Sequence, residues 1–226
     1  MSETIITVQG EHSAWYPAER ATVSAGIHAW GDDRDTAFAD AVSSADAVRA
    51  LIEPLVAALG GPITWWSSDS VRVWSERPWN NEGKQLDPVF HAAVDFTAKF
   101  SNFDALSRWV ESVAGIENAT VGSIEWDLTD ATRTSAIVEV RSRAVKDAVA
   151  KATVFAQSIG LGTVKAIALA DPGMLGDPTG GGNGVPGPML RGAMKASADF
   201  GGSPQLALKP EEITVSAVVD ARFVAS

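Results

Sequence analysis

The sequence predicts an α+β fold, in which mixed or antiparallel sheets pack against helices in the approximate order ββαββαβαββ. Two observations indicate the elements. Residues 90–100 alternate apolar and polar side chains strictly, which is typical of a strand with one buried face. Residues 136–159 instead place small and apolar side chains three or four positions apart, which is typical of a helix. Pairs of strands then alternate with single helices, which favours α+β over a regular parallel βαβ series.

The first third of the chain predicts two strands and a helix. Residues 6–10 and 21–30 both alternate, and the turn at Pro17 suggests that they form a hairpin. Asp32 and Asp33 then begin a helix, since acidic side chains favour a helix N-terminus. Its expected buried residues are Ala41, Ala45, Val48, Ile52, Leu55 and Leu59.

The middle third predicts a long strand over 63–74, with a bulge in its serine-rich stretch, and a loop over 78–88. The strand 90–100 follows. Ser101 and Asp104 resemble a capping box for a short helix with Leu106, Trp109, Val110 and Val113 on one side. A further strand covers 124–128.

The helix over 136–159 is expected to be the centre of the fold. Its predicted buried stripe contains Ile137, Val140, Ala144, Ala148, Ala152, Phe155 and Ile159. The alanines allow close approach to a sheet, and Gly160 suits a left-handed C-terminal residue. Strands over 164–170 and 213–223 complete the prediction of a single domain over residues 1–226, with a flexible Gly/Pro-rich loop at 171–209 between them.

Composition excludes several classes of protein. The 226 residues include 46% hydrophobic residues and carry a net charge of −10, which predicts a globular protein that does not bind nucleic acid. The absence of cysteine excludes disulfides and thiolate sites. No apolar run is long enough for a membrane-spanning helix, and the first residues lack a signal-peptide pattern. We therefore expect a soluble, acidic, cytoplasmic protein, or an exported one if a leader was removed.

Four ordered motifs are similar to the SIMPL domain family. They are an Ile-x-Val-x-Gly pattern at 6–10, a long Ala-rich helix ending in Leu-Gly at 59–60, the alanine-ridged helix closing with Ile-Gly-Leu-Gly at 159–162, and a Pro-x-x-Ile-x-Val-x-Ala-x-Val entry to the last strand at 210–219. The resemblance covers nearly the whole chain. It implies an α+β bacterial protein of unknown function, often exported and in some members assembled into ring-like or channel-like oligomers. It supplies no catalytic residues.

The residues that could carry chemistry do not form a recognisable constellation. His28 and His91 lie on polar strand faces, and they could share a site with Asp69 or Asp95 if the strands were neighbours. A metal needs three or four converging ligands, so ordinary surface histidines are expected. The glycines at 180–187 lack the Gly-Lys-Ser/Thr of a phosphate loop. We therefore predict no enzyme, no catalytic residues, no cofactor and no metal.

Tryptophan is the strongest compositional signal. Four of the eight tryptophans are Trp65, Trp66, Trp74 and Trp79, and adjacent Trp65 and Trp66 must face opposite sides of a strand. Exposed aromatic side chains suit an interface or a ligand platform, whereas buried ones only fill the core. The first hypothesis is a non-enzymatic structural or interaction protein that self-associates into a homo-oligomer. The alternative is a small-molecule or saccharide binder, with the Gly-rich loop as a lid and its ligand unknown.

Overall fold

The computed structural model describes residues 3–57, 60–175 and 208–226 and has the predicted α+β fold. The described elements follow the order ββαβββαβαββ, with one more strand than the sequence predicts. The chain forms two compact units. Unit 1 contains residues 1–17, 128–194 and 212–226, and unit 2 contains residues 18–127 and 195–211.

Unit 1 joins the two ends of the chain in one antiparallel sheet of order β1-β8-β7. β1 (Thr4–Pro17) pairs with β8 (Glu212–Ala225) along fourteen residues without a break in register, and β7 (Val164–Ala170) pairs with the end of β8. The predicted hairpin between residues 6–10 and 21–30 is therefore wrong. The residues of β1 carry no signal of a partner strand about two hundred positions later in the chain. A turn such as the one at Pro17, in contrast, is indicated by its own residues.

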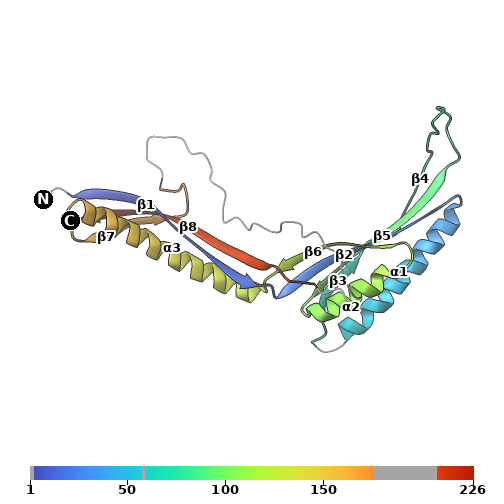
Figure 1. Ribbon diagram of the computed structural model, residues 1–226, viewed down its shortest axis with the longest axis horizontal. Coiled ribbons are helices and arrows are strands. Elements are labelled where there is room, and N and C mark those ends of the chain that lie inside the picture. The colour runs from blue at the N-terminus through green and yellow to red at the C-terminus, as the bar shows by residue number, and fades with distance from the viewer. Residues whose placement is uncertain (1–2, 58–59, 176–207) are drawn as a thin grey trace. The chain divides into compact units, whose positions relative to one another are not determined.

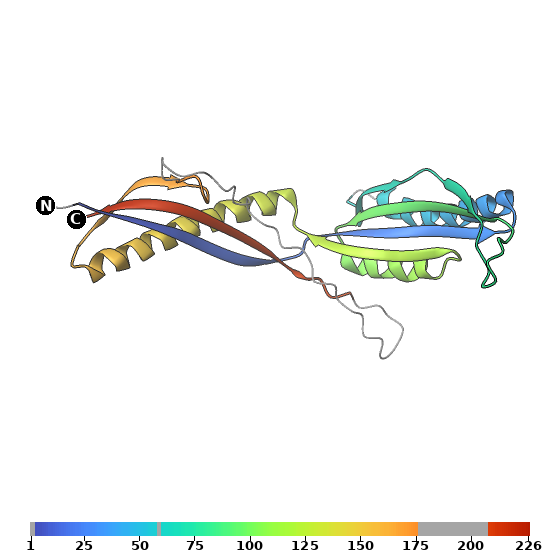
Figure 2. The ribbon, with the colours of Figure 1, turned by 90° about the horizontal axis from the view of Figure 1, so that it is seen from above.

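Helix α3 (Asp130–Ser158) covers one face of this sheet, running along β1 and β8 (Figure 2). Its buried residues are Ala136, Val140, Ala144, Ala148, Ala152 and Ala156. The predicted stripe is wrong at its end, since Phe155 and Ile159 are more than half exposed. Residues four apart drift about 40° around a helix, so they form a row inclined to its axis. The helix buries this inclined row because the strands beneath it twist.

Helix α3 approaches the sheet closely at Gly10, which is buried in β1. A Cβ atom at this position would lie 2.1 Å from the carbonyl oxygen of Ala144 and 2.7 Å from the Cβ of Ala148. The first of these neighbours is backbone, which cannot rotate away. Gly10 and the alanine row therefore set the distance between helix and sheet together.

Replacing Gly10 with Ala should lower the free energy of unfolding by about 1–3 kcal/mol or more, because the added methyl group overpacks the seam. Gly31→Ala is the matched control, since a Cβ at Gly31 meets nothing within 4 Å. Urea denaturation followed by circular dichroism measures both variants. Equal midpoints for Gly10→Ala and the wild type would mean that the helix does not contact β1 at this distance.

Side chains of α3 also cover part of the free edge of β1. The backbone N–H of Glu11 donates to Asp147 Oδ2 at 2.9 Å, and Lys151 Nζ donates to the carbonyl oxygen of Gln9 at 3.1 Å. Lys151 and Asp147 form an ion pair at 2.8 Å. The hydrogen bonds from Lys151 and from the Glu11 amide hold the pKa of Asp147 below its usual value. These contacts satisfy backbone groups that would otherwise offer an edge for another strand.

Because its pKa is lowered on folding, Asp147 contributes stability above pH of about 4, and this contribution is lost as the pH falls through its folded-state pKa. We expect Asp147→Asn to be less stable than the wild type at pH 7, and the difference to shrink between pH of about 4 and 2. Urea midpoints across this range provide the measurement, with Glu53→Gln on α1 as control. A difference that stays constant down to pH of about 2 would contradict this prediction.

Unit 2 contains a five-stranded antiparallel sheet. Its order is β3 (Ile63–Ser68), β5 (Val89–Phe100), β2 (Arg20–Gly31) and β6 (Ala119–Asp127), with β4 (Arg72–Glu76) also paired to β5. Helices α1 (Arg34–Ala57) and α2 (Phe103–Ala114) pack on the sheet through one continuous core. The alternating buried residues of β2 and β5, such as Val23, Ile27 and Phe96, face these helices.

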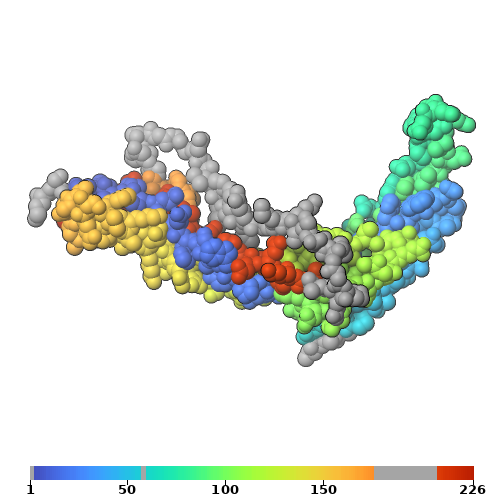
Figure 3. Space-filling view, in the orientation of Figure 1, coloured from blue at the N-terminus to red at the C-terminus, as the bar shows by residue number. Residues whose placement is uncertain are grey.

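The details of unit 2 refine three local predictions. The predicted strand over 63–74 is two strands, both paired with β5 and separated at residues 69–71. The helix α2 is capped by Asn102, whose side chain accepts from the Ala105 amide, so the predicted Ser101/Asp104 capping box is wrong. The loop over 78–88 closes the β4–β5 hairpin through a Trp79–Gln85 bridge, and this hairpin projects beyond the end of α1 (Figure 3).

The predicted flexible loop at 171–209 lies mostly outside the described residues. Its described first part, residues 171–175, is a turn held against β8, where the Gly173 amide donates to Asp220 Oδ2 at 2.7 Å. Arg222 also donates to the Leu175 carbonyl oxygen at 3.3 Å. The prediction of flexibility therefore stays a prediction.

Candidate functional site

The face of the unit 2 sheet opposite α1 and α2 carries the candidate site. Side chains alternate along each strand, so the residues next to the buried ones point to this face. We define the open face as Arg20, Thr22, Ser24, Gly26, His28 and Trp30 of β2, His91, Ala93, Asp95, Thr97 and Lys99 of β5, Trp65 and Ser67 of β3, Arg72, Trp74 and Glu76 of β4, and Thr120, Glu125 and Asp127 of β6. It combines aromatic, charged and small polar side chains.

The four tryptophans predicted as contact residues separate into three environments. Trp65 and Trp74 lie on the open face and are 48% and 43% exposed. Trp66 points the other way and packs against the core beneath the helices, as the alternation requires. Trp79 lies in the β4–β5 hairpin and is 66% exposed. Three of the four are therefore available for contact in the described chain, and Trp66 is core.

One tryptophan of the open face was not singled out from the sequence. Trp30 is 68% exposed and lies opposite His91 in the β2–β5 register, while Trp74 lies opposite His91 from the other side. These three residues form a row across three strands. The alternation of residues 21–30 places Trp30 on the polar face, but its two neighbours come from strands forty to sixty residues later.

The two histidines considered from the sequence meet at this row. His28 Nε2 lies 3.1 Å from His91 Nδ1, and the Trp74 ring stacks on both imidazoles at centroid distances of 5.6 and 5.2 Å. His91 Nε2 lies 3.4 Å from Glu76 Oε1. Either imidazole could donate in the contact between His28 and His91, and His91 Nε2 makes no hydrogen bond within the described residues. We define Trp74, His28 and His91 as the ring cluster.

The predicted carboxylate partners of the histidines lie elsewhere. Asp95 pairs with Arg72 at 2.6 Å, and the Asp69 amide donates to the Asp95 carbonyl oxygen. Lys99 lies at the far end of β5 from the ring cluster, with its Nζ 5.4 Å from the centroid of Trp65. At one end of the open face Lys99 therefore lies over the Trp65 ring. At the other end the ring cluster lies beside Glu76.

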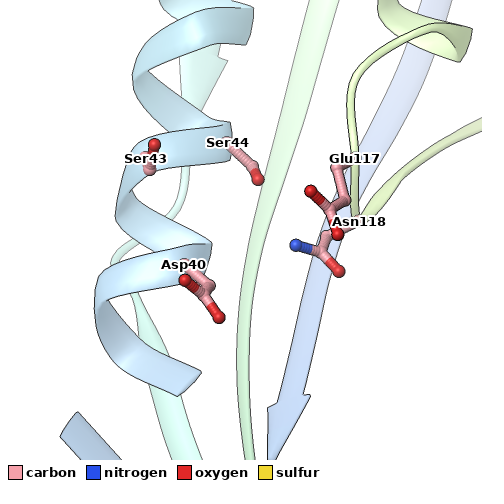
Figure 4. Close-up of a pocket in the computed structure, with 5 residues that line it drawn as sticks. All are labelled: Asp40, Ser43, Ser44, Glu117 and Asn118. Carbon is pink, nitrogen blue, oxygen red and sulfur yellow. The ribbon is translucent and has the colours of Figure 1, made fainter. Parts of the chain in front are cut away.

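A second feature of unit 2 is a small hollow between α1 and the turn before β6 (Figure 4). Asp40, Ser43 and Ser44 line it from the helix, and Glu117 and Asn118 line it from the turn. Neither serine has an imidazole among these lining residues, so the hollow lacks the base that a serine nucleophile requires.

The described residues also contain no group of three or more histidine, aspartate or glutamate side chains placed to hold a metal ion. His28 and His91 direct one nitrogen each at the other, and Glu76 approaches the opposite nitrogen of His91. Their donor atoms therefore do not converge on one point. No helix in the described part is both long and apolar enough to cross a bilayer.

Comparison with known families decides the relationship of the chain. Residues 6–223 match the SIMPL family, which is described as a protein of unknown function (DUF541). The chain belongs to the SIMPL family. The match takes in residues of both units, and the motifs that suggested it include Gly10, the alanine row of α3 and the start of β8. No curated protein matches this SIMPL chain.

The contact between the histidines leads to a prediction about metals. Adding Zn²⁺ or Ni²⁺ should leave the melting temperature of this SIMPL protein unchanged, because two histidines bonded to each other do not offer the three or four ligands that such ions bind. Differential scanning fluorimetry with and without a chelator measures this. A metal-induced rise in melting temperature that is lost in His91→Ala would show a metal site.

Proposed function

We propose that this SIMPL protein is a non-enzymatic structural or interaction protein that self-associates through the open face of unit 2. The observation that carries the proposal is the exposure of Trp30, Trp65 and Trp74 on one sheet face. Aromatic side chains are enriched in interface cores, and truncating them there is often costly to binding. Burying these rings against a second copy would remove apolar surface from water, at roughly 25 cal/mol per Å² before the entropy of association is subtracted.

The charge distribution also suits a second copy. Two molecules with a net charge of −10 repel each other unless they meet where the acidic excess is small. The open face carries three cations, Arg20, Arg72 and Lys99, and four carboxylates, Glu76, Asp95, Glu125 and Asp127. This surface is close to neutral and brings few like charges together.

Light scattering after size-exclusion chromatography tests the proposal. At tens of micromolar we expect a mass above that of the 23.7 kDa chain. Trp65→Ala and Trp74→Ala should each weaken association about tenfold or more, which is the effect expected of hot-spot aromatics. Trp15→Ala is the matched control, because Trp15 is similarly exposed at 65% but lies in unit 1. A monomer under all conditions would contradict the proposal.

A second candidate function is the binding of a small molecule or saccharide at the same face. The ring cluster favours it, because Trp74 remains 43% exposed and polar groups of Arg72, Asp95 and Glu76 lie on the same strands. Aromatic rings with nearby hydrogen-bonding groups suit sugar rings. Intrinsic tryptophan fluorescence that changes with a saccharide, and no longer does so in Trp74→Ala, would support it. The proposed lid lies mainly in residues outside the described part of the chain.

A further inference from the structure

We infer that two copies pack their open faces together in one orientation, with a two-fold axis that lies between the sheets and runs perpendicular to their strands. This inference rests on the self-association proposed above, and it adds which residues meet. The occupant of the open face is then a second copy of the chain, with β5 antiparallel to the β5 of its partner.

The positions of the charges on β4 and β5 fit this orientation. Lys99 reaches over Trp65 near one end of the open face, and Glu76 lies opposite Val89 near the other end. The ten steps from residue 89 to 99 span about 34 Å. An axis perpendicular to the strands exchanges the two ends, so it places Lys99 of each copy over Glu76 of the other. An axis parallel to the strands that runs along β5 would instead place Lys99 near Lys99.

The centre of the face fits the same axis. Arg72 lies opposite Ala93, next to Asp95, with which it forms an ion pair at 2.6 Å. When the axis crosses β5 between these two positions, each Arg72 comes beside the Asp95 of the other copy as well as its own. The four groups then alternate in sign. Like charges that meet in other orientations would be repulsive.

Small side chains at the centre allow the two sheets to approach. Ser24, Gly26, Ala93 and Thr97 lie between the Trp65 end and the ring cluster. The larger rings at each end can therefore contact the opposite end of the partner. Trp65 of one copy would meet Trp74 of the other, which are both close to half exposed. Aromatic pairs of this kind stabilise an interface beyond the area that they bury.

The size of the face is compatible with a specific dimer. Three to four strands about 4.8 Å apart and about 34 Å long give a flat area on the order of 500–650 Å². Side chains increase the accessible area above this flat value. Standard interfaces bury about 600–1,000 Å² on each partner, so the open face is at the lower end of this range.

A charge exchange tests the orientation. Lys99→Glu and Glu76→Lys should each raise the dissociation constant of the full-length protein on the order of tenfold, because each places two like charges together. The double variant should return to within a few-fold of the wild type, since it restores both pairs. Sedimentation equilibrium at low salt measures all three. Lys165→Glu on β7 and Glu53→Lys on α1 make the same charge changes outside the open face, and they should leave the constant unchanged.

The outcomes distinguish the orientation from self-association itself. A wild type that remains monomeric overturns both. A wild type that associates, but whose double variant is as weak as the two single effects combined, overturns the orientation and leaves self-association standing. Association unaffected by all three variants, together with a saccharide-dependent tryptophan signal, would assign the open face to a small ligand instead. Restoration in the double variant supports the proposed pairing.

Discussion

The contact between Gly10 of β1 and the alanine row of α3 is the constraint on which unit 1 depends. It brings a strand backbone against a helix backbone, with a position at which a Cβ would lie 2.1 Å from a carbonyl oxygen. That separation sets how far the helix stands above β1 and β8 and which of its rows is buried. Asp147 and Lys151, one turn apart on α3, can then reach the edge of β1. The edge of β1, the alanine row of α3 and Gly10 are therefore linked by one continuous set of contacts.

In unit 2 the helices cover one face of the sheet and leave the other face to polar and aromatic residues. An antiparallel sheet with one solvated face normally carries small polar or charged residues there. Here three tryptophans and two histidines occupy it, and one of the tryptophans, Trp74, stacks with both histidines. The stacking gives Trp74 a fixed orientation, which lowers the entropy lost when that ring makes a contact. If the open face forms an interface as proposed, the Trp74 ring would already be positioned before binding.

Several features could be predicted from residues close together in the chain. The alternation of residues 90–100 identified the central strand β5, and the Leu106, Trp109, Val110 and Val113 stripe identified the buried side of α2. Gly160 has the positive φ expected at the end of α3. Each of these depends on periodicity or on one residue's backbone preference. The family resemblance, confirmed over residues 6–223, also rests on such local motifs and their order.

The sequence by itself determined the α+β class, most of the elements, and the opposite orientations of Trp65 and Trp66. These follow from backbone geometry, which repeats every two residues in a strand and every 3.6 in a helix. Only the tertiary structure decided that β1 pairs with β8, that α3 buries Ala156 in place of Phe155, and that Trp74 stacks with His28 and His91. Strand pairing and helix inclination depend on contacts between distant segments and on sheet twist. No local pattern records them, and the candidate site exists only because β2 and β4 flank β5.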